Sequence, residues 1–131
     1  MNEKNRIEWS LFLLRLGVFV VMAMWTIDKI ISPDHAAKVF ENFYFISGLR
    51  SEIMMGVGLV EMLIILAFLA GLWKRFTYGF VLVVHGISTL SSWKQYLEPN
   101  LLFFAAWPML AACAALYLLR DWDRKFAIHK N

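Results

Sequence analysis

The sequence predicts an all-α integral membrane protein that folds as a four-helix bundle. Of its 131 residues, 60% are hydrophobic and 18% are charged, and the mean hydropathy is +0.59, which is more apolar than an ordinary soluble domain. The apolar residues gather into four runs, each near the length of about 20 residues that a helix needs to cross a bilayer. Four spans with short connections fill residues 1–131, so we expect a single transmembrane domain.

The first span is expected over residues 7–31, because Pro33 disfavours helix at the residue before it. The next segment is too polar to span a membrane, but Phe40, Phe43 and Tyr44 recur there at helical spacing. This pattern predicts a short interfacial helix in the first outer loop, with a loop packed over the bundle as the alternative. Aromatic anchors give a large contact area at low entropic cost, so these three side chains are predicted to face a partner.

The second span, over residues 53–73, is the most apolar and carries one ionisable residue, Glu61, near its centre. A charged group at mid-bilayer costs roughly 2.5–3.5 kcal/mol on insertion scales, so we expect Glu61 to face the protein and to have a partner. A tight turn at Lys74 and Arg75 leads to the third span, over residues 76–93. These two spans are expected to be antiparallel neighbours.

The third span has two distinct faces. His85 begins a polar stripe on one face, whereas Gly79 and Gly86 form a narrow face that favours close approach of another helix. The fourth span is expected over residues 101–119, with a kink at Pro108. The polar residues that follow it are expected to face solvent.

The distribution of Lys and Arg between the two sides of the spans predicts the orientation. Eight basic residues fall on one side and four on the other, namely Lys4, Arg6, Lys74, Arg75, Arg120, Arg124, Lys125 and Lys130 against Lys29, Lys38, Arg50 and Lys94. Cytoplasmic loops carry the excess of basic residues, so both termini are predicted to be cytoplasmic. Lys29 is expected to extend to the outer head groups.

Three ionisable residues of different spans are predicted to lie at similar depth. Counted at 1.5 Å per residue from the span ends, Arg15, Glu61 and His85 lie roughly 12–18 Å from the inner surface. Polar side chains at one height on facing helices can converge into one site. We therefore expect Arg15 and Glu61 to form a buried structural pair, with His85 beside it.

The same three residues also have a functional interpretation. Arg15, Glu61 and His85 would form a site for a quinone head group or another ligand, and His85 with Glu61 would hold a metal ion, because imidazole and carboxylate are common metal ligands. The structural interpretation, in which His85 is hydrogen-bonded to a neighbouring backbone or serine, stays open. The sequence assigns no catalytic residue, no definite cofactor and no enzymatic activity.

Other chemistries are disfavoured by the composition. The single cysteine, Cys113, has no partner thiol within the chain, so we expect it to act as a small hydrophobic residue. The formal charge of +3 is modest, and the basic residues cluster at span ends, so nucleic acid is not an expected partner.

Several residues and their order along the chain form a recognisable pattern, namely Arg15, Gly17, Asp28, Lys29, Gly58, Glu61, Gly71, Arg75 and the aspartate-rich tail RDWDRKF. This pattern, over about residues 11 to 125, resembles the DoxX-like family of small four-helix bacterial membrane proteins. It implies a small bacterial inner-membrane subunit that is redox-associated or interacts with quinone, beside a larger partner. His85 is not among these markers, so a site that used it would be particular to this chain.

We therefore expect a multi-pass protein of the bacterial inner membrane that acts as an accessory subunit with a polar mid-membrane site. Two alternatives stay open: a small carrier or channel for a metal ion or metabolite, and a structural or assembly partner of a larger membrane complex. The lipid bilayer is the first expected partner, a larger redox subunit is the second, and a homo-oligomer is a further alternative.

Overall fold

The computed structural model describes residues 2–44, 51–97 and 101–128, without the side chains of residues 43, 44, 51, 95, 101 and 102. These residues are helical almost throughout, and none of them forms a β-strand element. The elements are α1 (Glu3–Ile31), α2 (Pro33–Tyr44), α3 (Ser51–Ala70), α4 (Lys74–Ser91), α5 (Trp93–Leu97), η1 (Leu101–Ala105), α6 (Ala106–Leu118) and η2 (Arg120–Trp122). The all-α prediction is confirmed.

Two helices are long and apolar enough to cross a membrane, judged by length and composition. They are α1 and the stretch Glu52–Ala70 of α3. The apolar stretch Phe103–Leu118, which contains α6, is shorter. The predicted first and second spans therefore match long apolar helices. The first span and α1 both end at Ile31, and the other three ends differ by two to four residues.

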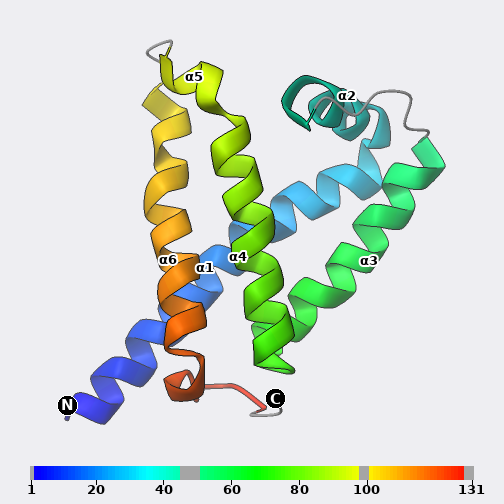
Figure 1. The fold of residues 1–131 in the computed structure, drawn as a ribbon. Helices are drawn as coiled ribbons and strands as arrows, with labels where there is room; N and C mark the ends of the chain where they lie inside the picture. Colours follow the sequence, from blue (N-terminus) through cyan, green and yellow to red (C-terminus); the bar gives the residue numbers. More distant parts are fainter. Residues whose placement is uncertain (1, 45–50, 98–100, 129–131) are drawn as a thin grey trace.

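The four long helices pack mainly as two pairs, α1 with α3 and α4 with α6. Although α3 and α4 are joined by a short turn and contact each other as predicted, each packs more extensively on its other neighbour. Figure 1 shows the start of α1 and the segment after η2 at one end of the molecule, and α2 and α5 at the other. We call these the terminal end and the opposite end.

The apolar core lies where the pairs meet. Its buried members are Leu11, Val18, Met22, Ile65, Phe68, Tyr78, Val81, Cys113 and Leu116. On α1, the buried residues recur every three or four positions, which gives a single inward stripe that also contains Arg15 and Thr26. This stripe brings polar side chains of α1 into the interior at two separate heights.

Glycines allow close packing at two places on α4. A Cβ atom added at Gly79 would lie 3.3 Å from the Tyr117 ring, and one added at Gly86 would lie 3.7 Å from Leu110. Tyr117 and Leu110 both belong to α6, so the glycine face predicted for the third span does adjoin another helix.

Two local predictions need correction. The turn before α4 consists of Gly71 to Trp73, and Lys74 is already the first residue of the helix. Gly71 has a φ of +71° and Trp73 a φ of +45°, a left-handed backbone that reverses the chain there. Pro108 lies in the first turn of α6, where its missing N–H costs little, so it begins a helix rather than kinking one.

The predicted short helix in the first outer loop is present as α2. It has an apolar face that includes the buried Ala36 and an exposed face that includes Lys38 and Glu41. The apolar face packs on α1 and α3 across the opposite end of the molecule. Contact of this helix with a membrane surface stays a prediction.

Candidate functional site

A buried cluster of charged and polar side chains lies at the terminal end. We call it the arginine cluster, and it consists of Arg15, Lys74, Tyr78 and Asp123. The Arg15 guanidinium donates to an Asp123 carboxylate oxygen at 2.7 Å, and the Tyr78 hydroxyl donates to the other carboxylate oxygen. The side chains of Arg15 and Asp123 are both 0% exposed, so this ion pair is fully removed from solvent.

The arginine cluster also holds the main chain that follows α6. Arg15 Nη2 donates to the carbonyl oxygens of Lys125 at 2.5 Å and Phe126 at 3.2 Å. Lys74 Nζ donates to the carbonyl oxygen of Arg120 at 3.0 Å and to that of Asp123. Charged donors bind carbonyl oxygens more strongly than neutral donors do. The segment from residue 119 to 126 is therefore held against the helices by its backbone.

Further contacts fix the end of this segment. The Phe126 ring packs against the Phe12 ring of α1 with centroids 4.9 Å apart. The Ile128 amide donates to the Ala70 carbonyl at 2.8 Å. A Cβ atom on Gly71 would lie 2.5 Å from the Cβ of Ala127, so the chain passes Gly71 as closely as a glycine allows. The prediction that the tail faces solvent is therefore wrong for this segment, although several of its side chains are exposed.

A second polar cluster joins α1 to α3 nearer the opposite end. We call it the glutamate cluster, and it consists of Thr26, Lys29 and Glu61. Lys29 Nζ lies 3.1 Å from one Glu61 carboxylate oxygen, and the Thr26 hydroxyl donates to the other at 2.9 Å. The Lys29 and Glu61 side chains are 12% and 9% exposed. Glu61 thus faces the protein and has a partner, as predicted, but the partner is Lys29.

Gly58 lets α3 approach α1 beside this pair. A Cβ atom at Gly58 would lie 2.8 Å from Ile30 Cγ1 and 3.0 Å from Lys29 Cβ. A larger residue would push apart the two helices that carry the ion pair. The short separation between Lys29 and Glu61 therefore depends on this glycine.

The predicted pair between Arg15 and Glu61 is wrong. Glu61 contacts Thr26, and Arg15 lies eleven residues earlier on α1, roughly 16 Å away along the helix axis. Helix α1 begins at Glu3, and its first turns extend past the end of α3. Arg15 is consequently level with the turn between α3 and α4. The expectation that Lys29 extends to the outer head groups is also wrong, because its ammonium is bound to Glu61.

His85 belongs to neither cluster. Its Nε2 lies 3.0 Å from the Ala106 carbonyl oxygen at the start of α6. Because a carbonyl can only accept, this geometry assigns the ring proton to Nε2. Among the described residues, no hydrogen bond or ion pair joins His85 to Arg15 or Glu61. The predicted convergence of the three residues is therefore not formed, and the structural alternative for His85, a hydrogen bond to backbone, fits the geometry.

The remaining predicted residues have these positions. Phe40 is half-buried, and its ring centroid lies 5.9 Å from Lys29 Nζ, so this aromatic packs toward α1. The side chains of Phe43 and Tyr44 lie outside the described residues, and a partner-facing role for the three stays a prediction. Cys113 is a buried free thiol in the apolar core, the environment of a small hydrophobic residue.

The described residues supply no further side chains that would complete a metal site at His85 and Glu61. Within residues 2–44, 51–97 and 101–128, no group of three or more His, Cys, Asp or Glu side chains has the proximity that a metal ion requires. His85 is bound to a backbone carbonyl, and Glu61 to a lysine and a threonine. No printed contact brings His85 and Glu61 together, so a metal site that uses both stays a prediction.

Five residues of the two clusters were not predicted as site residues, namely Thr26, Lys29, Lys74, Tyr78 and Asp123. The signal for Asp123 was available, because an arginine within an apolar run needs an acidic partner and the tail supplies two aspartates directly after the fourth span. Tyr78 and Lys74 carry no such signal. Their roles depend on the direction in which α4 presents them.

No protein-family model matches the chain, and no curated protein or solved structure is similar to it. The resemblance to DoxX-like proteins therefore stays a prediction that rests on the residues of this sequence.

Proposed function

We propose that this chain is a multi-pass protein of the bacterial inner membrane, with α1, α3, α4 and the η1–α6 segment as its four spans and both termini in the cytoplasm. The support is the apolar length of α1 and α3, the pairing of α4 with α6, and the location of the start of α1 and of the segment after η2 at the terminal end. The excess of Lys and Arg on that side agrees with a cytoplasmic terminal end. Reporter fusions after residue 131 and within α2 test the orientation.

We further propose that the protein is a DoxX-like accessory subunit, which acts by assembly with a larger redox-associated membrane partner. The observation that carries this proposal is that the buried charges are paired with each other within the protein. Arg15 is bound to Asp123, and Glu61 to Lys29, so the ionisable groups of α1 and α3 hold the helices and the tail together. Buried polar networks whose groups are largely paired specify one arrangement of a protein and leave few free groups for a ligand. In the arginine cluster, Nε of Arg15 is buried without a hydrogen-bond partner among the described residues.

The other expected functions fit this geometry less well. A quinone site or a carrier station built from Arg15, Glu61 and His85 would need the three side chains to meet, and each is bound elsewhere. The redox association itself is carried by the resemblance alone. The proposed function is therefore a structural one within a redox-associated assembly.

Purification of the tagged protein from its native membrane in a mild detergent tests the proposal. We expect a larger subunit to co-purify in constant ratio, together with the absorption spectrum of that subunit's cofactor. Recovery of the chain alone, with an absorption spectrum or bound metal of its own, would contradict it.

Helix α2 provides a matched pair of variants for the same experiment. Replacing the aromatics Phe40 and Phe43 by Ala is expected to weaken co-purification. Replacing Lys38 and Glu41, on the exposed face of the same helix, by Ala is expected to preserve it. Equal retention of the partner by both variants would remove α2 from the partner surface without affecting the accessory role.

A further inference from the structure

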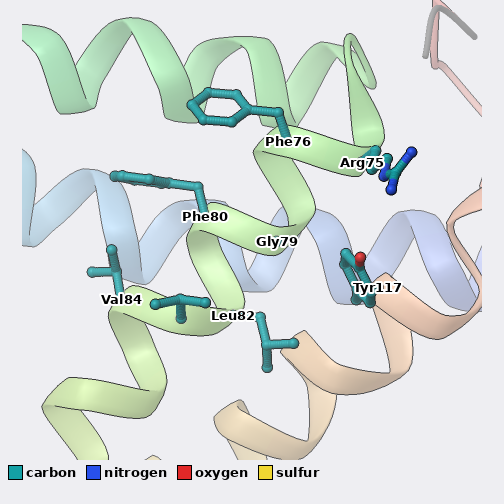
Figure 2. A pocket seen from close by; sticks show the side chains of 8 residues that line it. Arg75, Phe76, Gly79, Phe80, Leu82, Val84 and Tyr117 are labelled. Atoms are coloured by element: carbon teal, nitrogen blue, oxygen red, sulfur yellow. The ribbon is translucent and has the colours of Figure 1, made fainter.

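A groove runs along the outside of α4 and is closed on one side by a residue of α6. Its volume is about 550 Å³. Arg75, Phe76, Gly79, Phe80, Leu82, Val83, Val84 and Tyr117 line it. Figure 2 shows these side chains along successive turns of α4, with Arg75 near one end and Tyr117 reaching over from α6.

The groove has the length and surface of a site for a hydrocarbon chain. From Arg75 to Val84 the helix rises about 14 Å, close to half of the hydrocarbon core of a bilayer, which is about 30 Å thick. Phe76 and Val83 are 58% and 59% exposed, so the walls are apolar and accessible from the side. Gly79 lets the Tyr117 ring close this side of the groove, because a Cβ atom there would lie 3.3 Å from the ring.

One end of the groove is cationic. Arg75 is exposed, and its guanidinium makes no hydrogen bond or ion pair with the part of the chain that the structure describes. Arg120 is not among the lining residues; its guanidinium stacks 4.4 Å from the centroid of the Tyr117 ring and donates to the Tyr117 carbonyl oxygen at 2.8 Å. The neighbouring Lys74 is directed inward to backbone carbonyls. The Asp123 carboxylate is bound to Arg15 and Tyr78.

We propose that this groove binds one anionic phospholipid, with an acyl chain along α4 and the phosphate at Arg75. A basic site beside transmembrane helices on the cytoplasmic side recognises acidic lipid head groups, and a guanidinium binds phosphate through paired hydrogen bonds. The charge selects a phospholipid over a neutral isoprenoid quinone, which would fill the same apolar walls without pairing with Arg75. The inference rests on the membrane placement proposed above and is independent of the accessory role.

Native mass spectrometry of the full-length protein, delipidated in a neutral detergent, tests the proposal. The probes are phosphatidylglycerol and phosphatidylcholine with identical acyl chains, together with a ubiquinone. We expect one phosphatidylglycerol per chain, retained at least about fivefold better than phosphatidylcholine. Equal retention of the two phospholipids, or displacement of phosphatidylglycerol by equimolar quinone, would overturn it.

Two variants and one control localise the binding. Arg75→Gln should abolish the preference for phosphatidylglycerol, and its exposed position predicts unchanged folding. Val83→Trp should fill the groove and reduce retention of phosphatidylglycerol while Arg75 is intact. Arg6→Gln removes the same charge from an exposed position of α1 and should preserve the preference. Equal losses in Arg75→Gln and Arg6→Gln would mean that only the general positive charge attracts the lipid, and an undiminished preference in a folded Val83→Trp would exclude the groove.

Discussion

The arginine cluster and the glutamate cluster both join helices through an ion pair, but they differ in burial and in separation along the chain. Arg15 and Asp123 are 108 residues apart and 0% exposed, whereas Lys29 and Glu61 are 32 residues apart and 12% and 9% exposed. Loss of one partner strands a buried charge at the first site. At the second, the lysine stem can carry its ammonium outward. The comparison predicts that the terminal end is the less tolerant of the two.

The largest effect is expected for Arg15→Met. The substitution leaves Asp123 buried without its cation, and the carbonyls of Lys125 and Phe126 lose their donor. The free energy of unfolding should therefore fall by about 3–5 kcal/mol. Denaturation in detergent measures this loss. Arg6→Met, at an exposed position of the same helix, should stay within roughly 0.5 kcal/mol of the original protein. Similar losses in the two variants would show that Arg15 makes no special contribution.

The two clusters also show what could be predicted from the sequence. The apolar runs predicted the long helices, because a run of about 20 apolar residues has the length of a membrane-spanning helix. The need of Glu61 for a partner followed from the cost of an isolated charge. Gly79 and Gly86 were correctly predicted to adjoin another helix.

The identity of each ion-pair partner could not be predicted by counting residues. Counting along a helix gives a height relative to the end of its apolar run, but α1 extends past α3, so equal counts do not mean equal heights. The tail was assigned to solvent because its composition is polar, although Asp123 turns inward. Of the markers of the DoxX-like resemblance, Arg15, Glu61, Gly58 and Gly71 all make close contacts between elements. In this chain these four residues join helices to each other or to the tail. They therefore indicate a fold more clearly than an activity.

A smaller loss is expected for Glu61→Gln. The amide keeps an acceptor for the Thr26 hydroxyl but loses the charge that binds Lys29, and a hydrogen bond to a charged group contributes roughly 1.5–3 kcal/mol. Glu52→Gln, at an exposed position of α3, is the matched control. A loss for Glu61→Gln as large as that of Arg15→Met would contradict the ranking of the clusters.

The packing beside the glutamate cluster can be tested with two glycines of α3. Alanine at Gly58 would meet Ile30 and Lys29, whereas alanine at Gly56 would meet nothing within 4 Å. We expect Gly58→Ala to destabilise by about 1 kcal/mol after its gain in helix propensity, and Gly56→Ala to stabilise by roughly 0.5–1 kcal/mol. Thermal unfolding of both variants measures the difference, and equal shifts would mean that α1 and α3 are not this close.

The pairing itself is tested most directly by two double-mutant cycles that share Arg15→Met, one with Asp123→Asn and the other with Glu61→Gln, measured by unfolding in detergent. The structure predicts that the double variant at Arg15 and Asp123 recovers part of the summed single losses, because neither charge is then stranded. It predicts additive losses for Arg15 and Glu61, whose partners are different. Additivity in the first cycle together with recovery in the second would contradict the assignment of Arg15 to Asp123.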